Sequence, residues 1–288
     1  MGASEIRRVG VVGLGAMGAG IAQLAVEAGY ETTGREVSDE LLSRGLGRIR
    51  GFLQEGVKRG KVTQADADKA LSKVTGTTSF ADLKDCDLVI EAVVENLEEK
   101  RKVFGELDRA CKPAAILASN TPSILITEIA SATKRADRIL GIHFMQPVPI
   151  MKLVELVRPD ATSEATYREA RAFVESLGKV TITAKDTPGF IVNLLLVPYL
   201  CDAVRALEKG LATKEDIDTG MELGCGMPMG PIKLADFVGL DTALHITEVL
   251  HEGLRDPKYA APEMLKQLVK AGRLGKKSGA GFYDYGPK

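Results

Sequence analysis

The stretch RVGVVGLGAMGAGIA at residues 8–22 joins an apolar run typical of a strand to an alanine-rich run typical of a helix. Between them, Gly13 allows a tight turn, Gly15 lets the backbone approach a pyrophosphate, and Gly18 lets the helix pack closely on the sheet. The N–H groups at the start of that helix point toward the phosphates. Glu36 follows a second short strand, where its carboxylate can accept hydrogen bonds from an adenosine ribose and would repel a 2′-phosphate. The sequence therefore predicts a dinucleotide site that prefers NAD to NADP.

Length and composition restrict the class of protein. The chain has 288 residues, with 38 Lys and Arg against 39 Asp and Glu. This length favours two domains over one, and no basic block indicates a nucleic-acid or membrane-surface partner. No apolar run approaches the roughly 20 residues of a membrane span, and the four cysteines lie far apart without metal-ligand spacing. We expect a cytoplasmic protein with no signal peptide, no nucleic-acid or membrane partner and no metal site.

The pattern of elements changes once along the chain. From residue 6 to about 185, β-rich runs alternate with helical ones, as in a parallel sheet covered by helices, and a helical hairpin at about 38–72 interrupts the alternation. Beyond Pro188-Gly189 only helices are expected, over 190–209, 213–223, 231–252 and 262–271. We therefore predict an α/β domain with a Rossmann-like, doubly wound sheet over 1–186 and an all-helical domain over 187–288.

Polar side chains stand at the ends of several expected strands, where open α/β sheets bind their ligands. Glu91, Asn120 and His143 end or directly follow three successive strands, and Glu155 lies inside the next one. Because burying Glu155 without a partner is costly, we expect its carboxylate to orient the ring of His143. An imidazole held in this way is a stronger base, suited to taking a proton from an alcohol. The alternative for His143 is a core histidine satisfied by a backbone carbonyl.

Two further side chains have both a functional and a structural interpretation. Asn193 opens the helical domain and can supply an amide to the same crevice, or it is an ordinary residue of a first helical turn. Lys100 can reach a phosphate, although a solvated helix face is the more common place for such a lysine.

Together these motifs resemble the 3-hydroxyacyl-CoA dehydrogenases, particularly their short bacterial members, over essentially the whole chain. The stretches that carry the resemblance are 13–18, 89–96, 119–121, 143–147, 151–155, 188–193, 229–231 and 281–285. The resemblance implies an NAD-binding Rossmann-like domain followed by a helical domain that forms a homodimer and closes over the substrate.

The resemblance also implies residue roles. It makes His143 the general base, Glu155 its orienting carboxylate and Asn193 a polar partner at the substrate carbonyl. With the glycine turn, the predicted cofactor contacts are Gly13, Gly15, Ala16, Met17, Gly18, Glu36, Glu95, Lys100 and Asn120.

Four positions of the expected substrate pocket depart from the family pattern. The serine that hydrogen-bonds the reacting oxygen in the family is Pro122, which has neither hydroxyl nor N–H. Gln146 replaces an asparagine, Leu194 an arginine, and Met227 a histidine or phenylalanine. Losing a hydrogen-bonding group at a reacting oxygen costs about 10²–10³ in rate. We therefore expect weaker acyl-CoA chemistry unless Gln146 compensates.

These observations predict an NAD-dependent oxidoreductase of fatty acid metabolism. It would interconvert a 3-hydroxyacyl-CoA and its 3-oxo form by hydride transfer, with histidine as general acid and base. Two alternatives stay open at this point. The pocket is reshaped, by evolution or engineering, to reduce or reductively aminate a carbonyl compound that is not a CoA ester, or the chain is a catalytically weakened NAD-binding or structural protein.

Overall fold

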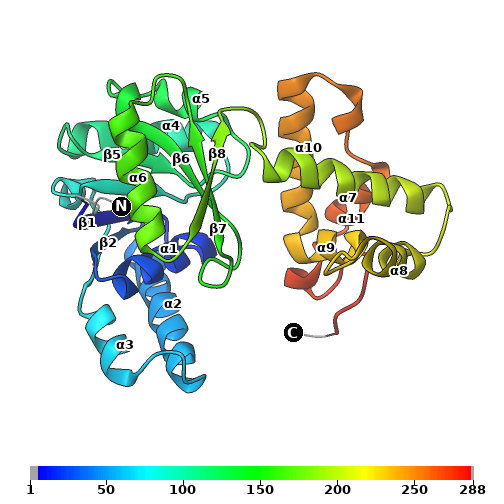
Figure 1. Ribbon diagram of the computed structural model, residues 1–288, viewed down its shortest axis with the longest axis horizontal. Coiled ribbons are helices and arrows are strands. Elements are labelled where there is room, and N and C mark those ends of the chain that lie inside the picture. The colour runs from blue at the N-terminus through cyan, green and yellow to red at the C-terminus, as the bar shows by residue number, and fades with distance from the viewer. Residues whose placement is uncertain (1–5, 287–288) are drawn as a thin grey trace. The chain divides into compact units, whose positions relative to one another are not determined.

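The computed structural model describes residues 6–286, and the chain divides into two compact units, Met1–Asp186 and Thr187–Lys288 (Figure 1). The division falls just before Pro188 and Gly189, and Gly189 has φ +73°. That left-handed conformation favours glycine. No helix within residues 6–286 is long and apolar enough to cross a membrane.

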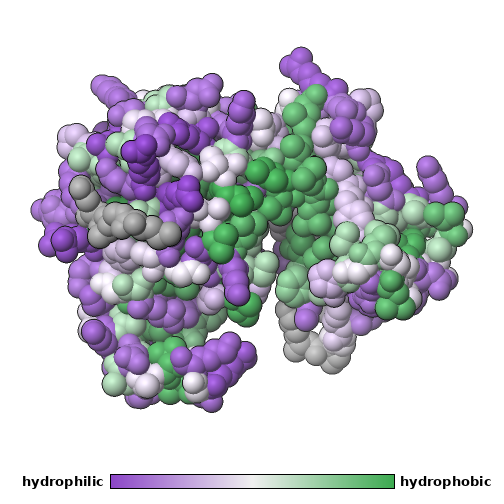
Figure 2. All heavy atoms as spheres, viewed as in Figure 1, coloured by the Kyte–Doolittle hydropathy of each residue, from purple (hydrophilic) through white to green (hydrophobic). Residues whose placement is uncertain are grey.

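The first unit is an eight-stranded sheet covered by helices on both faces (Figure 1). Its strands are β1 (Arg8–Val12), β2 (Glu31–Arg35), β3 (Val74–Thr77), β4 (Leu88–Glu91), β5 (Ile116–Ser119), β6 (Ile139–Phe144), β7 (Leu153–Arg158) and β8 (Val180–Lys185). Its helices are α1 (Ala16–Glu27), α2 (Asp39–Lys58), α3 (Gln64–Leu71), α4 (Leu97–Ala110), α5 (Ile126–Ala130) and α6 (Glu164–Ser176). The helices turn mainly hydrophilic faces outward (Figure 2).

The strand order is β3-β2-β1-β4-β5-β6-β7-β8, so the chain reverses its direction across the sheet between β1 and β4. The prediction of a parallel sheet is wrong at one pairing, because β7 runs antiparallel to β6. The reason is the short connection between them, since a parallel crossover needs about a dozen residues or more. The longer connection through α6 makes β8 parallel to β7.

The helical hairpin is formed by α2 and α3, between β2 and the edge strand β3 (Figure 1). Ser38 and Thr63 cap the two helices by accepting hydrogen bonds from the backbone N–H groups of their first turns. The strand β3 was not predicted, because it has four residues, a glycine in its middle and little apolar surface. Such a strand carries almost no periodic signal.

The second unit contains α7 (Val192–Glu208), α8 (Lys214–Cys225), α9 (Pro231–Val238), α10 (Leu240–Leu254) and α11 (Glu263–Lys270). The expected helix over 231–252 is in fact two helices, α9 and α10. They separate at Gly239, whose φ of +101° is incompatible with a continuous right-handed helix. Apolar residues of α7, α9, α10 and α11 form a core that belongs to this unit alone.

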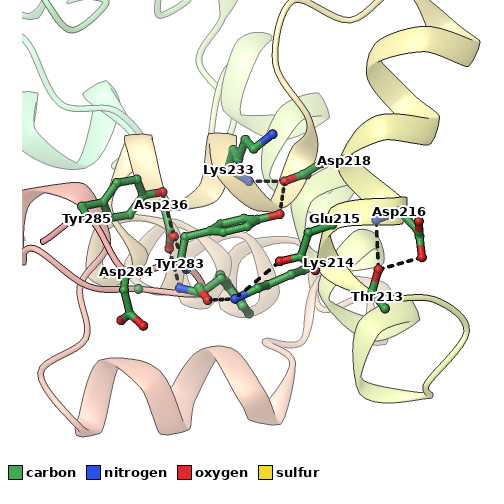
Figure 3. Close-up of polar contacts among 12 residues, drawn as sticks. Thr213, Lys214, Glu215, Asp216, Asp218, Lys233, Asp236, Tyr283, Asp284 and Tyr285 are labelled. Carbon is green, nitrogen blue, oxygen red and sulfur yellow. Dashed lines mark hydrogen bonds and ion pairs between the residues drawn. The ribbon is translucent and has the colours of Figure 1, made fainter.

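Two buried aspartates fasten the end of the chain onto the helices of the second unit (Figure 3). Asp236 accepts hydrogen bonds from the backbone N–H groups of Phe282 and Tyr283 and from the hydroxyl of Tyr285, each at 2.9 Å. Asp218 accepts the hydroxyl of Tyr283 at 2.8 Å. Burial, together with the hydrogen bonds to the aspartates, raises the pKa of both tyrosines above its ordinary value. The C-terminal aromatics are thus structural.

Candidate functional site

The glycine turn lies where β1 ends and α1 begins, at the carboxyl edge of the sheet. A Cβ added to Gly13 would come within 2.7 Å of the carbonyl oxygen of Ala92, and one added to Gly18 within 1.8 Å of the carbonyl oxygen of Gly13. A Cβ at Gly15 would meet nothing within 4 Å. Gly13 and Gly18 are therefore required by the fold, whereas Gly15 borders open space, as a bound pyrophosphate requires.

The carboxylate of Glu36 is fixed beside this turn. One of its oxygens accepts the backbone N–H of Leu14 at 2.6 Å, and the other accepts that of Val37 at 3.2 Å. Within the described chain, no side chain caps the N-terminus of α1. The turn therefore offers backbone N–H groups on one side and a carboxylate on the other, which fits a phosphate and a ribose.

His143 and Glu155 form a buried pair on β6 and β7. They are register partners in the antiparallel pairing of these strands, which brings their side chains together. The Nδ1 of His143 lies 2.7 Å from the Oε2 of Glu155. An ionised carboxylate only accepts, so Nδ1 carries the hydrogen and Nε2 is the basic nitrogen. The partner of Nδ1 is thus a carboxylate, as expected from the cost of burying Glu155 alone.

Asn120 connects the end of β5 to β6. Its side-chain oxygen accepts the backbone N–H of Phe144 at 2.9 Å, directly beside His143. Its own backbone N–H donates to the carbonyl oxygen of Glu91 at 2.8 Å. The structure therefore brings Asn120 and the His143–Glu155 pair to one region of the sheet edge, as the positions of the strand ends predicted.

Lys100 does not lie on a solvated helix face, so that structural interpretation is wrong. Its side chain is 1 % exposed, and its Nζ lies 2.8 Å from Glu91 and 3.1 Å from Glu95. Burial acts to lower the pKa of Lys100, but the two carboxylates outweigh it and the pKa lies above its usual value. No role was predicted for Glu91 beyond its place at a strand end, although a carboxylate that ends an apolar strand is the same kind of signal as Glu155.

Two family models cover almost the whole chain. The NAD-binding domain of 3-hydroxyacyl-CoA dehydrogenase matches residues 8–187, and the C-terminal domain of the same enzyme matches residues 189–285. The chain belongs to the 3-hydroxyacyl-CoA dehydrogenase family. It is an NAD-dependent oxidoreductase, and the predicted fold class and cofactor are confirmed.

Relatives of this dehydrogenase are similar over their full length. The 3-hydroxybutyryl-CoA dehydrogenase of Bradyrhizobium diazoefficiens is 49% identical, over 98% of this chain and 97% of that protein. The crystal structure of Mycobacterium tuberculosis FadB2 has a TM-score of 0.96 and 48% identity, covering 98% of this chain and 99% of that one. The (S)-3-hydroxybutyryl-CoA dehydrogenase PaaH1 of Ralstonia eutropha has a TM-score of 0.94 and 44% identity, covering 98% and 100%. These relatives support the dehydrogenase interpretation and neither alternative.

The four positions that depart from the family pattern occur in both units. Pro122 is half-buried in the loop after β5, and Gln146 is exposed in the connection between β6 and β7. Leu194 lies in the first turn of α7 beside the buried Asn193. Met227 is 41 % exposed between α8 and α9. Two of these residues belong to the first unit and two to the second, and their gathering at one pocket stays a prediction.

Proposed function

We propose that this dehydrogenase oxidises the 3-hydroxyl group of a short 3-hydroxyacyl-CoA, such as 3-hydroxybutyryl-CoA, and reduces the 3-oxo thioester in the reverse direction. The observation that carries the proposal is the buried His143–Glu155 pair at 2.7 Å in a chain of this family. The relatives from Bradyrhizobium diazoefficiens and Ralstonia eutropha bear the name 3-hydroxybutyryl-CoA dehydrogenase, which supports the substrate class.

The proposed roles follow from the geometry of the pair. Glu155 holds Nδ1–H of His143, so that Nε2 takes the proton of the substrate hydroxyl. The carboxylate of Glu155 then stabilises the imidazolium, without itself accepting the proton. When bound, NAD⁺ would accept the hydride from the carbon that carries this hydroxyl. In the reductive direction the imidazolium of His143 returns its proton to the substrate oxygen. Asn193, buried in the first turn of α7, is proposed to hold the substrate carbonyl.

We infer that the two halves of the cofactor lie on either side of the switch point between β1 and β4. The backbone of Gly15, Ala16 and Met17 would contact the pyrophosphate, and Glu36 the adenosine ribose. The nicotinamide half would then lie over the ends of β4 and β5. The proposed contacts there are Glu95, Lys100 and Asn120.

The substrate assignment is tested by NADH oxidation with acetoacetyl-CoA, compared with a panel of free keto acids, keto esters and ketones with and without ammonia. Turnover is expected with the thioester. Activity on the panel alone would contradict the assignment. Pro122→Ser and Gln146→Asn test the pocket positions, because either should raise the rate on the thioester if the natural side chains limit it.

We also propose that the helical unit pairs with a second copy of the chain. Leu195, Leu211 and Leu223 are 68 %, 77 % and 82 % exposed, and a second copy of the chain could bury their apolar side chains. Apolar side chains reach the surface of this unit (Figure 2). Sedimentation equilibrium should give twice the chain mass, and a Leu223→Lys variant that keeps that mass would exclude Leu223 from the interface.

We further infer a cytoplasmic location. All four cysteines lie within the described chain and carry free thiols, which suits a reducing compartment. Fractionation of the native host, with thiol labelling of the exposed Cys225, would test this.

A further inference from the structure

Glu91 is a buried carboxylate that the proposed mechanism does not use. It ends β4 and is wholly excluded from solvent. One oxygen accepts the hydroxyl of Ser119, at the end of β5, at 2.7 Å. The other accepts the backbone N–H of Val93 at 2.7 Å and the ammonium of Lys100, on α4, at 2.8 Å. A single side chain therefore joins two strand ends and the first turn of a helix.

Lys100 connects Glu91 to the loop after β5 through Glu95 and Thr121. Its ammonium also contacts Glu95 at 3.1 Å, and the hydroxyl of Thr121 donates to the other oxygen of Glu95. The hydroxyl oxygen of Thr121 in turn accepts the backbone N–H groups of Ser123 at 3.3 Å and Ile124 at 3.0 Å. The conformation of residues 121–124 thus depends on Glu95, and the position of Glu95 depends on Lys100.

The same segment is tied to the strand that carries the base. Asn120 lies between Ser119 and Thr121, and its side-chain oxygen accepts the N–H of Phe144 beside His143. Displacement of Ser119 or Thr121 therefore moves Asn120 and, with it, the end of β6.

Stability alone does not explain a glutamate at this place. The three residues before it, Leu88, Val89 and Ile90, are fully buried and apolar. Replacing a buried ion pair by well-packed apolar side chains is often neutral or stabilising, because the desolvation penalty disappears. Two carboxylates around one ammonium also leave the cluster of Glu91, Glu95 and Lys100 with one excess negative charge. Such a charge attracts a cation that binds close to the cluster.

We propose that Glu91 is a positioning residue of the cofactor site, acting through Lys100 and the loop after β5. This proposal rests on the proposed function, in which Lys100, Glu95 and Asn120 face the nicotinamide half of NAD. Glu91 keeps these groups in place, and its charge makes the cluster favour the cationic oxidised nicotinamide over the neutral reduced ring.

The test is Glu91→Gln in the full chain, with Kd measured for NAD⁺ and NADH by calorimetry and by NADH fluorescence. The Kd of NADH should rise about threefold, and that of NAD⁺ about fivefold more, because the neutral glutamine removes a negative charge that attracts only the cationic ring. A purely structural residue would move both constants together. Both constants unchanged, or raised by the same factor, would overturn the proposal.

A double-mutant cycle with Lys100→Met tests the route of the effect. Because Glu91 acts through Lys100, adding Glu91→Gln to Lys100→Met should weaken NADH binding by less than twofold further. The double variant keeps one negative charge, as the natural chain does, so its ratio of NAD⁺ to NADH affinity should return toward the natural value. Additive losses would show that Glu91 does not act through Lys100 and would overturn the proposal.

Glu99→Gln is the matched control, since it removes the same charge from the exposed side chain of Glu99 on α4; it should leave both constants within twofold. If Glu91→Gln does not fold, Glu91→Asp replaces it. Aspartate keeps the charge but is too short to reach Ser119, Val93 and Lys100 together, so both constants should rise with their ratio unchanged, and unchanged constants would overturn the proposal. A natural chain that binds neither form of NAD would instead refute the proposed function.

Discussion

The two units surround their buried carboxylates with different partners. In the first unit, Glu155 faces the imidazole of His143, and Glu91 faces the ammonium of Lys100. Both partners are nitrogen groups that carry or can acquire a positive charge. The carboxylates lie at the carboxyl edge of the sheet, where α/β folds bind ligands.

In the second unit, Asp236 is held by two backbone N–H groups and by the hydroxyl of Tyr285. These donors keep their protons, since peptide N–H groups do not titrate and burial raises the pKa of Tyr285. This difference distinguishes the carboxylates of the candidate active site from a carboxylate that stabilises the fold. A buried carboxylate beside an ionisable nitrogen can stabilise the positive charge of that nitrogen, whereas one held by neutral donors fixes a chain segment.

The comparison predicts the largest loss of activity for His143→Ala. Removing a general acid and base lowers kcat by about 10²–10⁴-fold, while the Kd of NADH should stay within twofold because the glycine turn is untouched. Stopped-flow reduction of acetoacetyl-CoA measures the first quantity and fluorescence titration the second. His251→Ala is the control, since His251 is exposed on α10. Equal turnover in the natural chain and His143→Ala would remove His143 from the mechanism.

Asp236→Ala should show the opposite behaviour, a loss of stability with little change in chemistry. It leaves the N–H groups of Phe282 and Tyr283 and the hydroxyl of Tyr285 without their acceptor. Each unsatisfied buried donor costs about 1–3 kcal/mol, so the free energy of unfolding should fall by about 3 kcal/mol or more. Urea unfolding gives this value. If the folded fraction instead lost its kcat at unchanged stability, the architectural interpretation would fail.

Glu155→Gln should reduce kcat by about 10–10²-fold, less than His143→Ala. Glutamine still accepts the hydrogen of Nδ1, but the imidazolium loses its counter-charge, and hydrogen bonds to charged groups are worth about 1.5–3 kcal/mol. The KM for acetoacetyl-CoA should change little, because Glu155 acts through His143. A raised KM at unchanged kcat would place Glu155 in substrate binding.

Alkaline pH should give the smallest effect, a decline in the free energy of unfolding that is due to two buried thiols of the first unit. Burial raises the pKa of Cys86 from 9.0 to about 12 and that of Cys111 from 9.0 to about 11. Because the folded pKa values are the higher ones, these thiols stabilise the fold fully below pH 9.0. That contribution declines above it by about 1.4 kcal/mol per pH unit for each thiol, until the folded pKa is reached. Urea unfolding of Cys86→Ala between pH 9.0 and 11 should show a shallower decline, whereas the exposed Cys225→Ala should match the natural chain.

Much of the first unit could be predicted because its signals are local. The glycine turn could be predicted from its residues alone, because Gly13 and Gly18 have no room for a Cβ in the structure. The expected contact between His143 and Glu155 followed from the cost of burying a lone carboxylate. The two expected partners turned out to face each other across an antiparallel pair, a strand direction that was not foreseen.

The remaining errors come from tertiary contacts that leave no local signal. Lys100 lies in the charged run from Glu98 to Lys102 at the start of α4, and its burial depends on Glu91 and Glu95, which no helical periodicity identifies. The break at Gly239 was hidden because the helical pattern continues on both sides of it. The four departures from the family pattern were recognised as residue types, but their effect depends on a substrate whose contacts the sequence does not encode.

The antiparallel connection of β6 and β7 also determines how easily the contact between His143 and Glu155 forms within the chain. His143 and Glu155 are separated by only twelve residues, whereas 49 separate Asp236 from Tyr285. Loop-closure entropy grows by about 0.6 kcal/mol for each doubling of the loop, so the more distant pair costs about 1.2 kcal/mol more to close. After a local opening, the base and its carboxylate can therefore meet again within one hairpin, without waiting for the rest of the chain.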